Sequence, residues 1–154
     1  MRKKKARVPF VSNTPDDMHC VPAVFRMIHK YFLKKDISWK EIDKLMKVVP
    51  GKATWTFVGE MEFAKKVIEV INIEPVDYNL LHKEGIHYLK KIVGDETAKY
   101  YLERSNVASV LKYIPRYLQS VKHETRKSTI KEVLGYLKRG DLVGAEVNSD
   151  ILNN

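Results

Sequence analysis

The sequence predicts an α+β domain that is rich in helices and has a few short strands. Three observations lead to this fold class. Apolar residues repeat with helical spacing in several segments, short β-prone segments lie near the beginning, middle and end, and Gly and Pro separate them. With 154 residues, 44% of them hydrophobic, the chain is long enough for one domain with a substantial core.

A turn-rich loop that leads into an amphipathic helix opens the chain. Residues 1–6 form a basic arm that we expect to be disordered, and residues 7–11 can form a short strand. Residues 12–18 contain Asn, Thr-Pro and Asp-Asp, which favour turns. A helix is expected from about Cys20 to Lys34. Its apolar face consists of Val21, Val24, Phe25, Ile28 and Phe32.

Two more helices complete the first half. Ser38 and Glu41 form a capping box, which predicts the start of a second helix that ends before Pro50. A loop that carries Trp55 follows. A third helix is expected to begin near Phe57, because apolar residues recur at helical spacing from there.

The second half alternates helices with short strands. Residues 71–78 are expected to form a strand edged by Pro75, and residues 123–126 could form another. Helices are expected over residues 79–93, 95–104, 106–121 and 128–139. The inward face of the last helix consists of Ile130, Val133, Leu134 and Leu137. Residues 142–147 are mostly apolar, which is typical of a buried central strand.

The composition narrows the classes of function. The formal charge of +9 comes from 28 basic and 19 acidic residues spread along the chain, without the signature of a nucleic-acid-binding motif. We therefore read the charge as a solvated surface and do not expect a nucleic-acid partner. No segment approaches the roughly 18 apolar residues of a membrane span, and the basic N-terminus lacks the apolar core of a secretory signal. A single cysteine excludes an internal disulfide and a thiolate zinc site and fits a cytoplasmic location. We expect no cofactor and no metal.

Cys20 is the only cysteine, and it lies where the turn-rich loop becomes a helix. Pro22 fits the first helical turn, where its missing N–H leaves no hydrogen bond unmade. Unpaired N–H groups and the positive end of the helix dipole favour a thiolate there, and the thiolate is the reactive form of cysteine. We therefore predict that Cys20 is a nucleophile. The alternative is a small buried residue at a helix start.

A specific motif surrounds this cysteine. The segment Val8-Pro9-Phe10, an amide residue at Asn13, a short acidic loop and Cys20-Val21-Pro22-Ala23 before an apolar helix resemble the bacteriocin-processing (double-glycine leader) cysteine peptidase-like family. The resemblance implies a papain-like α+β fold, with a helix-rich half followed by a small antiparallel sheet. It also implies thiol-dependent hydrolysis of a peptide or amide bond.

The family pattern can be carried over to two positions. Cys20 matches the nucleophile, and Asn13 stands where the family has a Gln that helps form the oxyanion hole. The family's His would follow the strand that ends near Val147, so we expect it beyond Asn154. Residues 7–154 are therefore expected to be a single papain-like domain, truncated before its last strands and inactive as it stands. Val21 departs from the family, which usually has Gly after the cysteine.

Other residues have two interpretations each. Asn13 is either an oxyanion donor or the start of an Asx turn. His19 and Trp55 are candidates for substrate binding; the alternatives are a solvent-facing imidazole and a packed indole. His123 is the best base within the chain, although nothing in the sequence brings it to Cys20. Asp16 and Asp17 form a solvated turn, and His29, His82 and His87 are expected at the surface of helices.

Two functions from different classes remain open. The first is a cysteine peptidase-like hydrolase with a peptide or protein substrate. The second is a non-catalytic module on the same fold that binds a peptide or a polyanion. The sequence does not give the oligomeric state.

Overall fold

The computed structural model describes residues 7–66 and 68–147, and the chain divides into two compact units. The main unit consists of Val8–Lys127. The second unit consists of Met1–Arg7 and Ser128–Asn154, of which Arg7 and residues 128–147 are described. The basic arm expected over residues 1–6 lies outside the described residues.

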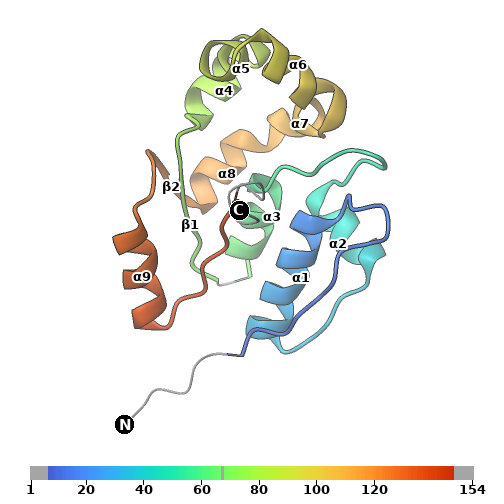
Figure 1. Ribbon diagram of the computed structural model, residues 1–154, viewed down its shortest axis with the longest axis vertical. Helices are drawn as coiled ribbons and strands as arrows, with labels where there is room; N and C mark the ends of the chain where they lie inside the picture. Colours follow the sequence, from blue (N-terminus) through green and yellow to red (C-terminus); the bar gives the residue numbers. More distant parts are fainter. Residues whose placement is uncertain (1–6, 67, 148–154) are drawn as a thin grey trace, which may run out of the picture. The chain divides into compact units, whose positions relative to one another are not determined.

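The described part of the chain is mostly helical (Figure 1). The helices of the main unit are α1 (Cys20–Leu33), α2 (Trp39–Met46), α3 (Phe57–Ala64), α4 (Tyr78–Glu84), α5 (Ile86–Val93), α6 (Asp95–Arg104), α7 (Val107–Val110) and α8 (Ile114–Ser120), with a 3-10 turn at Leu111–Tyr113. Its strands are β1 (Ile71–Glu74) and β2 (Lys122–Thr125). The second unit contains α9 (Ile130–Arg139).

Local sequence signals set several helix boundaries. Ser38 begins α2 with the expected capping box: its hydroxyl accepts the Glu41 N–H, and the Glu41 carboxylate accepts the Ser38 N–H. Thr129 and Glu132 cap α9 in the same way. The single helix expected over residues 79–93 is wrong, because Gly85 adopts φ +57° between α4 and α5 and breaks it.

Helix α3 lies between two hydrophobic clusters of the main unit. Its buried Phe63 packs with Phe25 of α1 and with Ile42 and Met46 of α2. The other side of α3 belongs to a larger cluster. That cluster contains Phe57, Val58, Met61, Tyr78, Leu81, Tyr88, Leu89, Ala98, Val107, Val110, Ile114, Tyr117 and Val121. A helix that is apolar on more than one side is buried, and α3 follows this rule.

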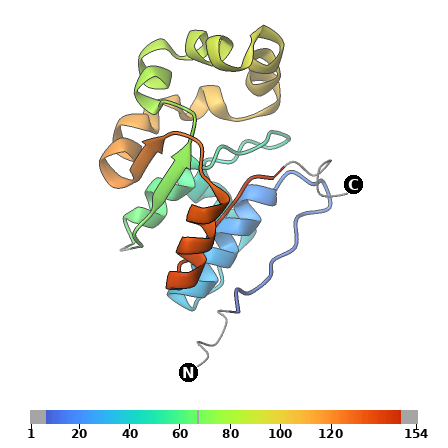
Figure 2. The same cartoon turned by 60° about the vertical axis from the view of Figure 1, so that its left-hand side comes forward.

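Strands β1 and β2 form a parallel pair. Their register places Ile71 opposite Lys122 and Asn72 opposite His123. Figure 2 shows the two arrows side by side and pointing in the same direction. Parallel strands need a long crossover, and helices α4 to α8 form it here.

The papain-like fold with a small antiparallel sheet is therefore wrong for this structure. The described residues are helix-rich and contain one two-stranded parallel sheet, whose strands come from the middle of the chain and from residues 122–125. The segments 7–11 and 142–147, expected to be strands, have no regular secondary structure. A strand is stable only when its backbone N–H and C=O groups are paired, and neither segment has that pairing among the described residues.

The prediction that the apolar side of the last helix faces inward is also wrong. Helix α9 forms as expected, but Ile130 is 74% exposed, Leu134 48% and Leu137 51%. Val143 and Val147 in the following segment are exposed as well. The amphipathic pattern predicted the helix correctly, yet none of the residues of α9 is buried.

Candidate functional site

Cys20 occupies the position that the sequence predicts and is exposed. It is the first residue of α1, a helix of 14 residues. His19 is the N-cap residue, and its carbonyl oxygen accepts the Ala23 N–H at 2.8 Å. The alternative of a small buried cysteine is therefore wrong. The thiol stands at the helix end where N–H groups have no partner within the helix.

Asn13 organises the loop in front of this cysteine. Its side-chain oxygen accepts two backbone N–H groups, from Thr14 at 2.9 Å and from His19 at 3.0 Å. Its amide nitrogen lies 3.5 Å from Oδ1 of Asp17. Neither contact is the bond to the N–H two residues on that defines an Asx turn, and residue i+2 is Pro15, which has no N–H; Asn13 instead ties the start of the loop to its end at His19. The role of Asn13 as an oxyanion donor stays a prediction.

His19 is held between the loop and α2 and does not point into solvent. Its side chain is 16% exposed. Nδ1 lies 2.9 Å from the Thr14 hydroxyl, which donates its own hydrogen to Asp16, and Nε2 lies 3.3 Å from Oδ2 of Asp43. The ring also meets the edge of Trp39, with ring centres 5.3 Å apart.

The same loop affects the pKa of the neighbouring carboxyl group of Asp16. The pKa of Asp16 is lowered, first by the hydrogen bond from the Thr14 hydroxyl and then by the Met18 N–H. Asp16 itself is exposed. It therefore serves as a solvated turn residue, as the sequence predicts, and fixes the hydroxyl that supports His19.

Trp55 is placed by hydrogen bonds to the helical crossover. Its indole N–H donates to the Ser105 hydroxyl at 3.1 Å, and its backbone N–H donates to the side-chain oxygen of Asn106 at 2.9 Å. The ring packs edge-on against Phe57 and Tyr101. This is the packed arrangement that was one of its two interpretations. Substrate binding by Trp55 stays a prediction.

The structure does not bring a histidine to Cys20. Among the described residues, which include every histidine of the chain, no imidazole lies within hydrogen-bonding distance of its sulfur. His82 and His87 are exposed, as expected. His29 is 5% exposed, so its expected surface position is wrong.

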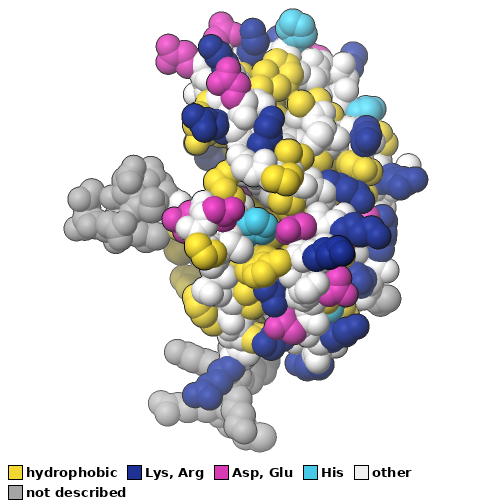
Figure 3. All heavy atoms as spheres, turned by 90° about the vertical axis from the view of Figure 1, so that its right-hand side faces the viewer, with side chains coloured by type: hydrophobic (Ala, Val, Ile, Leu, Met, Phe, Trp, Pro, Cys, Tyr) yellow, Lys and Arg dark blue, Asp and Glu magenta, His cyan; other side chains and the backbone are white. Residues whose placement is uncertain are grey.

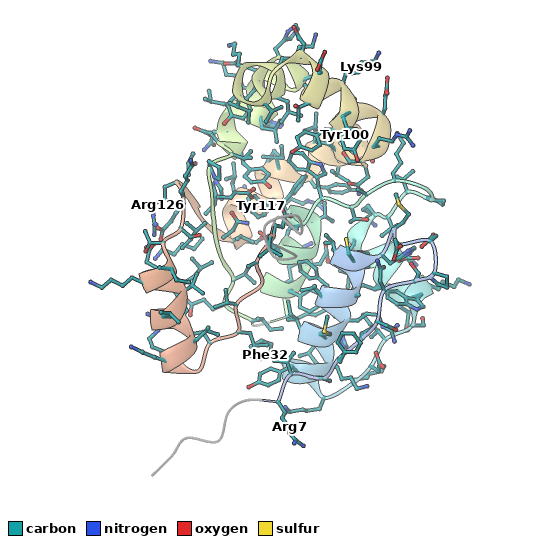
Figure 4. All side chains as sticks on the ribbon, viewed as in Figure 1. Arg7, Phe32, Lys99, Tyr100, Tyr117 and Arg126 are labelled. Atoms are coloured by element: carbon teal, nitrogen blue, oxygen red, sulfur yellow. The ribbon has the colours of Figure 1, made fainter. Side chains whose placement is uncertain are left out.

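His123 belongs to a separate group of polar side chains, the Asn72–His123 network. Nδ1 of His123 lies 2.9 Å from Oδ1 of Asn72 and 3.2 Å from the Tyr117 hydroxyl. Nε2 lies 2.9 Å from the carbonyl oxygen of Val76. Figure 4 labels Tyr117, which reaches the imidazole from α8. Asn72 in turn donates from Nδ2 to Glu60 at 3.0 Å, which completes the network.

Glu60 is the titrating group of this network. Burial raises the pKa of its carboxyl to about 7, and the negative charge of Glu74 adds to the rise. Hydrogen bonds from Thr56, Asn72 and Tyr117 act in the opposite direction. The pKa of the Tyr117 hydroxyl is raised as well, mainly by burial. The network therefore combines two carboxylates, an imidazole and a phenol inside the main unit.

Sequence reasoning missed three members of these groups. Asp43 contacts His19 from another helix, Asn72 contacts His123 from 51 residues earlier in the chain, and Glu60 is joined to Asn72. One signal was present: α3 has apolar residues on most of its surface, so at least one of its two glutamates, Glu60 and Glu62, has an apolar surrounding. Within the described residues, no three His, Cys, Asp or Glu side chains gather as metal ligands.

The arrangement at Cys20 can attack an electrophile but has no general base of its own among the described residues. The described helices also include none with the length and apolar composition to cross a membrane. Comparisons of the chain with protein-family models, curated proteins and solved structures find no match. The resemblance of residues 8–23 to the peptidase-like family therefore stays a prediction.

Proposed function

We propose that Cys20 is a nucleophilic thiol and that the protein is a cysteine peptidase-like hydrolase acting on a peptide or amide bond. The observation that supports this proposal is the exposure of the only cysteine as the first residue of α1. Free cysteines are usually buried, so an exposed one at the positive end of a helix is a chemically favoured nucleophile.

In the proposed reaction, bonds form and break in a defined order. The thiolate of Cys20 attacks the carbonyl carbon, and the resulting oxyanion is held by the Cys20 N–H and by Asn13. The C–N bond then breaks, the amine leaves with a proton, and water hydrolyses the remaining thioester to the acid. Asn13 can act in this way only when its amide nitrogen leaves Asp17, from which it is now 3.5 Å away.

Protonation of the leaving amine is the step that limits the rate of amide hydrolysis in this proposal. No described imidazole lies within hydrogen-bonding distance of the sulfur, so in this proposal a water molecule supplies the proton for the leaving amine. The chain alone should therefore be slow on amides. It should still react with reagents whose leaving group needs no proton, such as iodoacetamide and p-nitrophenyl acetate.

The test measures the rate of alkylation of Cys20 by iodoacetamide at pH 7, followed by intact mass. A helix dipole contributes about 0.3–1 kcal/mol, so we expect the native chain to react roughly two- to fivefold faster than the same chain in urea. Cys20→Ala should abolish labelling and the release of p-nitrophenol. A native rate equal to or below the unfolded rate would contradict the proposal.

A second candidate rests on the net charge of +9. On the face shown in Figure 3, Lys and Arg side chains are interspersed with acidic and hydrophobic ones and do not form one continuous basic patch. Binding of a polyanion would show as affinity for heparin that falls steeply with added salt. Tight, salt-sensitive binding together with an unreactive Cys20 would favour this function over the hydrolase.

A further inference from the structure

A cavity of about 390 Å³ lies on the main unit, and Cys20 is not among the residues that line it. Its apolar lining comes from Leu33 of α1, Ile37 of the loop before α2, and Leu45 of α2. Cavities that hold small molecules begin at about 300 Å³ and combine apolar walls with a few polar groups. This cavity reaches that size, and it is more polar than most, with four polar or charged lining residues beside the three apolar ones.

His29 supplies the buried polar group. The residue is 5% exposed and lines the cavity from α1. Its Nδ1 lies 2.6 Å from the carbonyl oxygen of Lys35, so Nδ1 carries a hydrogen and donates. The ring meets the edge of Phe63, with ring centres 6.0 Å apart, which fixes its orientation. Nε2 has no hydrogen-bond partner among the described residues and remains for a ligand.

Three charged side chains share the lining with His29. They are Lys35, Lys66 and Glu41. The carboxylate of Glu41 is already used, because it accepts the Ser38 N–H and hydroxyl at 2.8 Å each. These hydrogen bonds lower the pKa of Glu41, so it stays ionised. The lining therefore carries two lysines and one carboxylate that is already hydrogen-bonded, which leaves an excess of positive charge for an anion.

We propose that this cavity binds a small organic carboxylate with an apolar chain, whose acid group lies between Nε2 of His29 and the ammonium of Lys66. The apolar chain lies along Leu33, Ile37 and Leu45. In the complex Nε2 donates to the carboxylate while Nδ1 keeps its hydrogen bond to the carbonyl oxygen of Lys35. This inference is independent of the proposed reaction of Cys20.

The first experiment titrates sodium octanoate into the full chain and follows the imidazole Cε1–H resonance of His29 by NMR. A ligand of this size is expected to bind with a dissociation constant of about a millimolar or less. Octan-1-ol has the same apolar chain without the charge and should bind roughly tenfold more weakly, and octylamine should not bind. Absence of saturable binding, or equal binding of the alcohol, would overturn the proposal.

Variants separate the site from general effects. Lys66 is exposed, so Lys66→Glu should leave the fold intact and weaken octanoate roughly tenfold by placing a negative charge at the acid group. The matched control is Lys99→Glu on α6, which should bind octanoate as the parent chain does. His29→Gln, which lacks the imidazole Nε2, should weaken octanoate binding as well, as measured by calorimetry. Unchanged affinity in Lys66→Glu would refute the site.

Discussion

Asn72 and His123 are register partners in the parallel pair of β1 and β2, and their side chains are joined by a hydrogen bond of 2.9 Å. The amide of Asn72 donates to Glu60, so its side-chain oxygen is turned towards the imidazole. Nε2 of His123 faces the carbonyl oxygen of Val76. Both ring nitrogens therefore lie beside carbonyl oxygens. The pairing of the two strands and the polar network that leads to Glu60 thus share the same two residues.

Replacing His123 should destabilise the main unit. In His123→Ala, Asn72 and the Val76 carbonyl lose their hydrogen-bond partner and the tyrosine rings of Tyr78 and Tyr117 lose a ring contact. We expect the free energy of unfolding to fall by about 2–4 kcal/mol. Urea unfolding followed by circular dichroism measures it. The control is His82→Ala, which is exposed and should change stability by less than about 0.5 kcal/mol.

Glu60 should make the stability of the protein fall as pH rises through neutrality. Its pKa is about 7 in the folded state against an ordinary 4.5, so between these values the folded chain holds a proton that the unfolded chain has released. Stability is then full below pH 4.5 and decreases up to about pH 7, by roughly 3 kcal/mol in all. Glu60→Gln should remove most of this slope and be the more stable protein at pH 8.

The control for this prediction is Glu62→Gln, on the same helix and paired with Lys65 at the surface. It should keep the slope of the parent chain. Carboxylates with a lowered pKa, such as Asp36 beside Arg26, act in the opposite direction and only at lower pH. Stability curves of Glu60→Gln and the parent that stay parallel from pH 5 to pH 8 would show that Glu60 is not the titrating group.

Gly59 is required by the packing of α3. A Cβ at this position would lie 2.7 Å from Cε of Met46 and 2.9 Å from the ring of Phe25. Gly59→Ala should therefore cost about 1–3 kcal/mol by overpacking, despite the better helix propensity of alanine. Gly135 in α9 has no atom within 4 Å of such a Cβ. Gly135→Ala should strengthen α9 by about 0.5–1 kcal/mol. Equal effects at both positions, measured by denaturant unfolding and helix content, would argue against the tight contact.

The capping box of α2 should matter to the stability of the main unit. Ser38→Ala removes the acceptor of the Glu41 N–H, and a loss of about 1 kcal/mol is expected. Helix α2 buries Ile42 and Met46, so the cap supports packed residues. In α9, Thr129→Ala removes an equivalent cap from a helix without buried residues. Its effect should appear as faster amide exchange at the start of α9. An unchanged midpoint in Ser38→Ala would contradict the first expectation.

Local signals predicted most helices correctly. The position of Pro22, the capping boxes at Ser38 and Thr129, and Gly140 after α9 act within a few residues, so they can be read along the chain. Pairing of strands is not local. The short β1 and β2 carry no strong alternation, and nothing in either sequence indicates that they pair with each other and in parallel. Segment 142–147 was expected to be buried from its apolar composition alone, which does not supply a partner.

In the candidate site, too, features that depend on nearby residues could be predicted from the sequence, and contacts between distant residues could not. The place of Cys20 at the start of α1 follows from Pro22 and the helical period after it, and the structure agrees. The partners of His19 and His123 come from distant elements, Asp43 from α2 and Asn72 from β1. Single-sequence reasoning finds residue types at helix ends, but it does not find side chains that meet only when the chain has folded.

The crossover between β1 and β2 also sets an order for synthesis. Asn72 leaves the ribosome 51 residues before His123, and α4 to α8 emerge in between. Until residue 125 is outside the exit tunnel, the nascent chain has β1 without its partner strand, and Asn72 lacks its hydrogen bond to His123. Long-range contacts of this kind form late, because the intervening chain must first be closed into a loop. The helices before β1 can fold during translation, whereas the pairing of β1 with β2 that completes the main unit follows only after β2 has been synthesised.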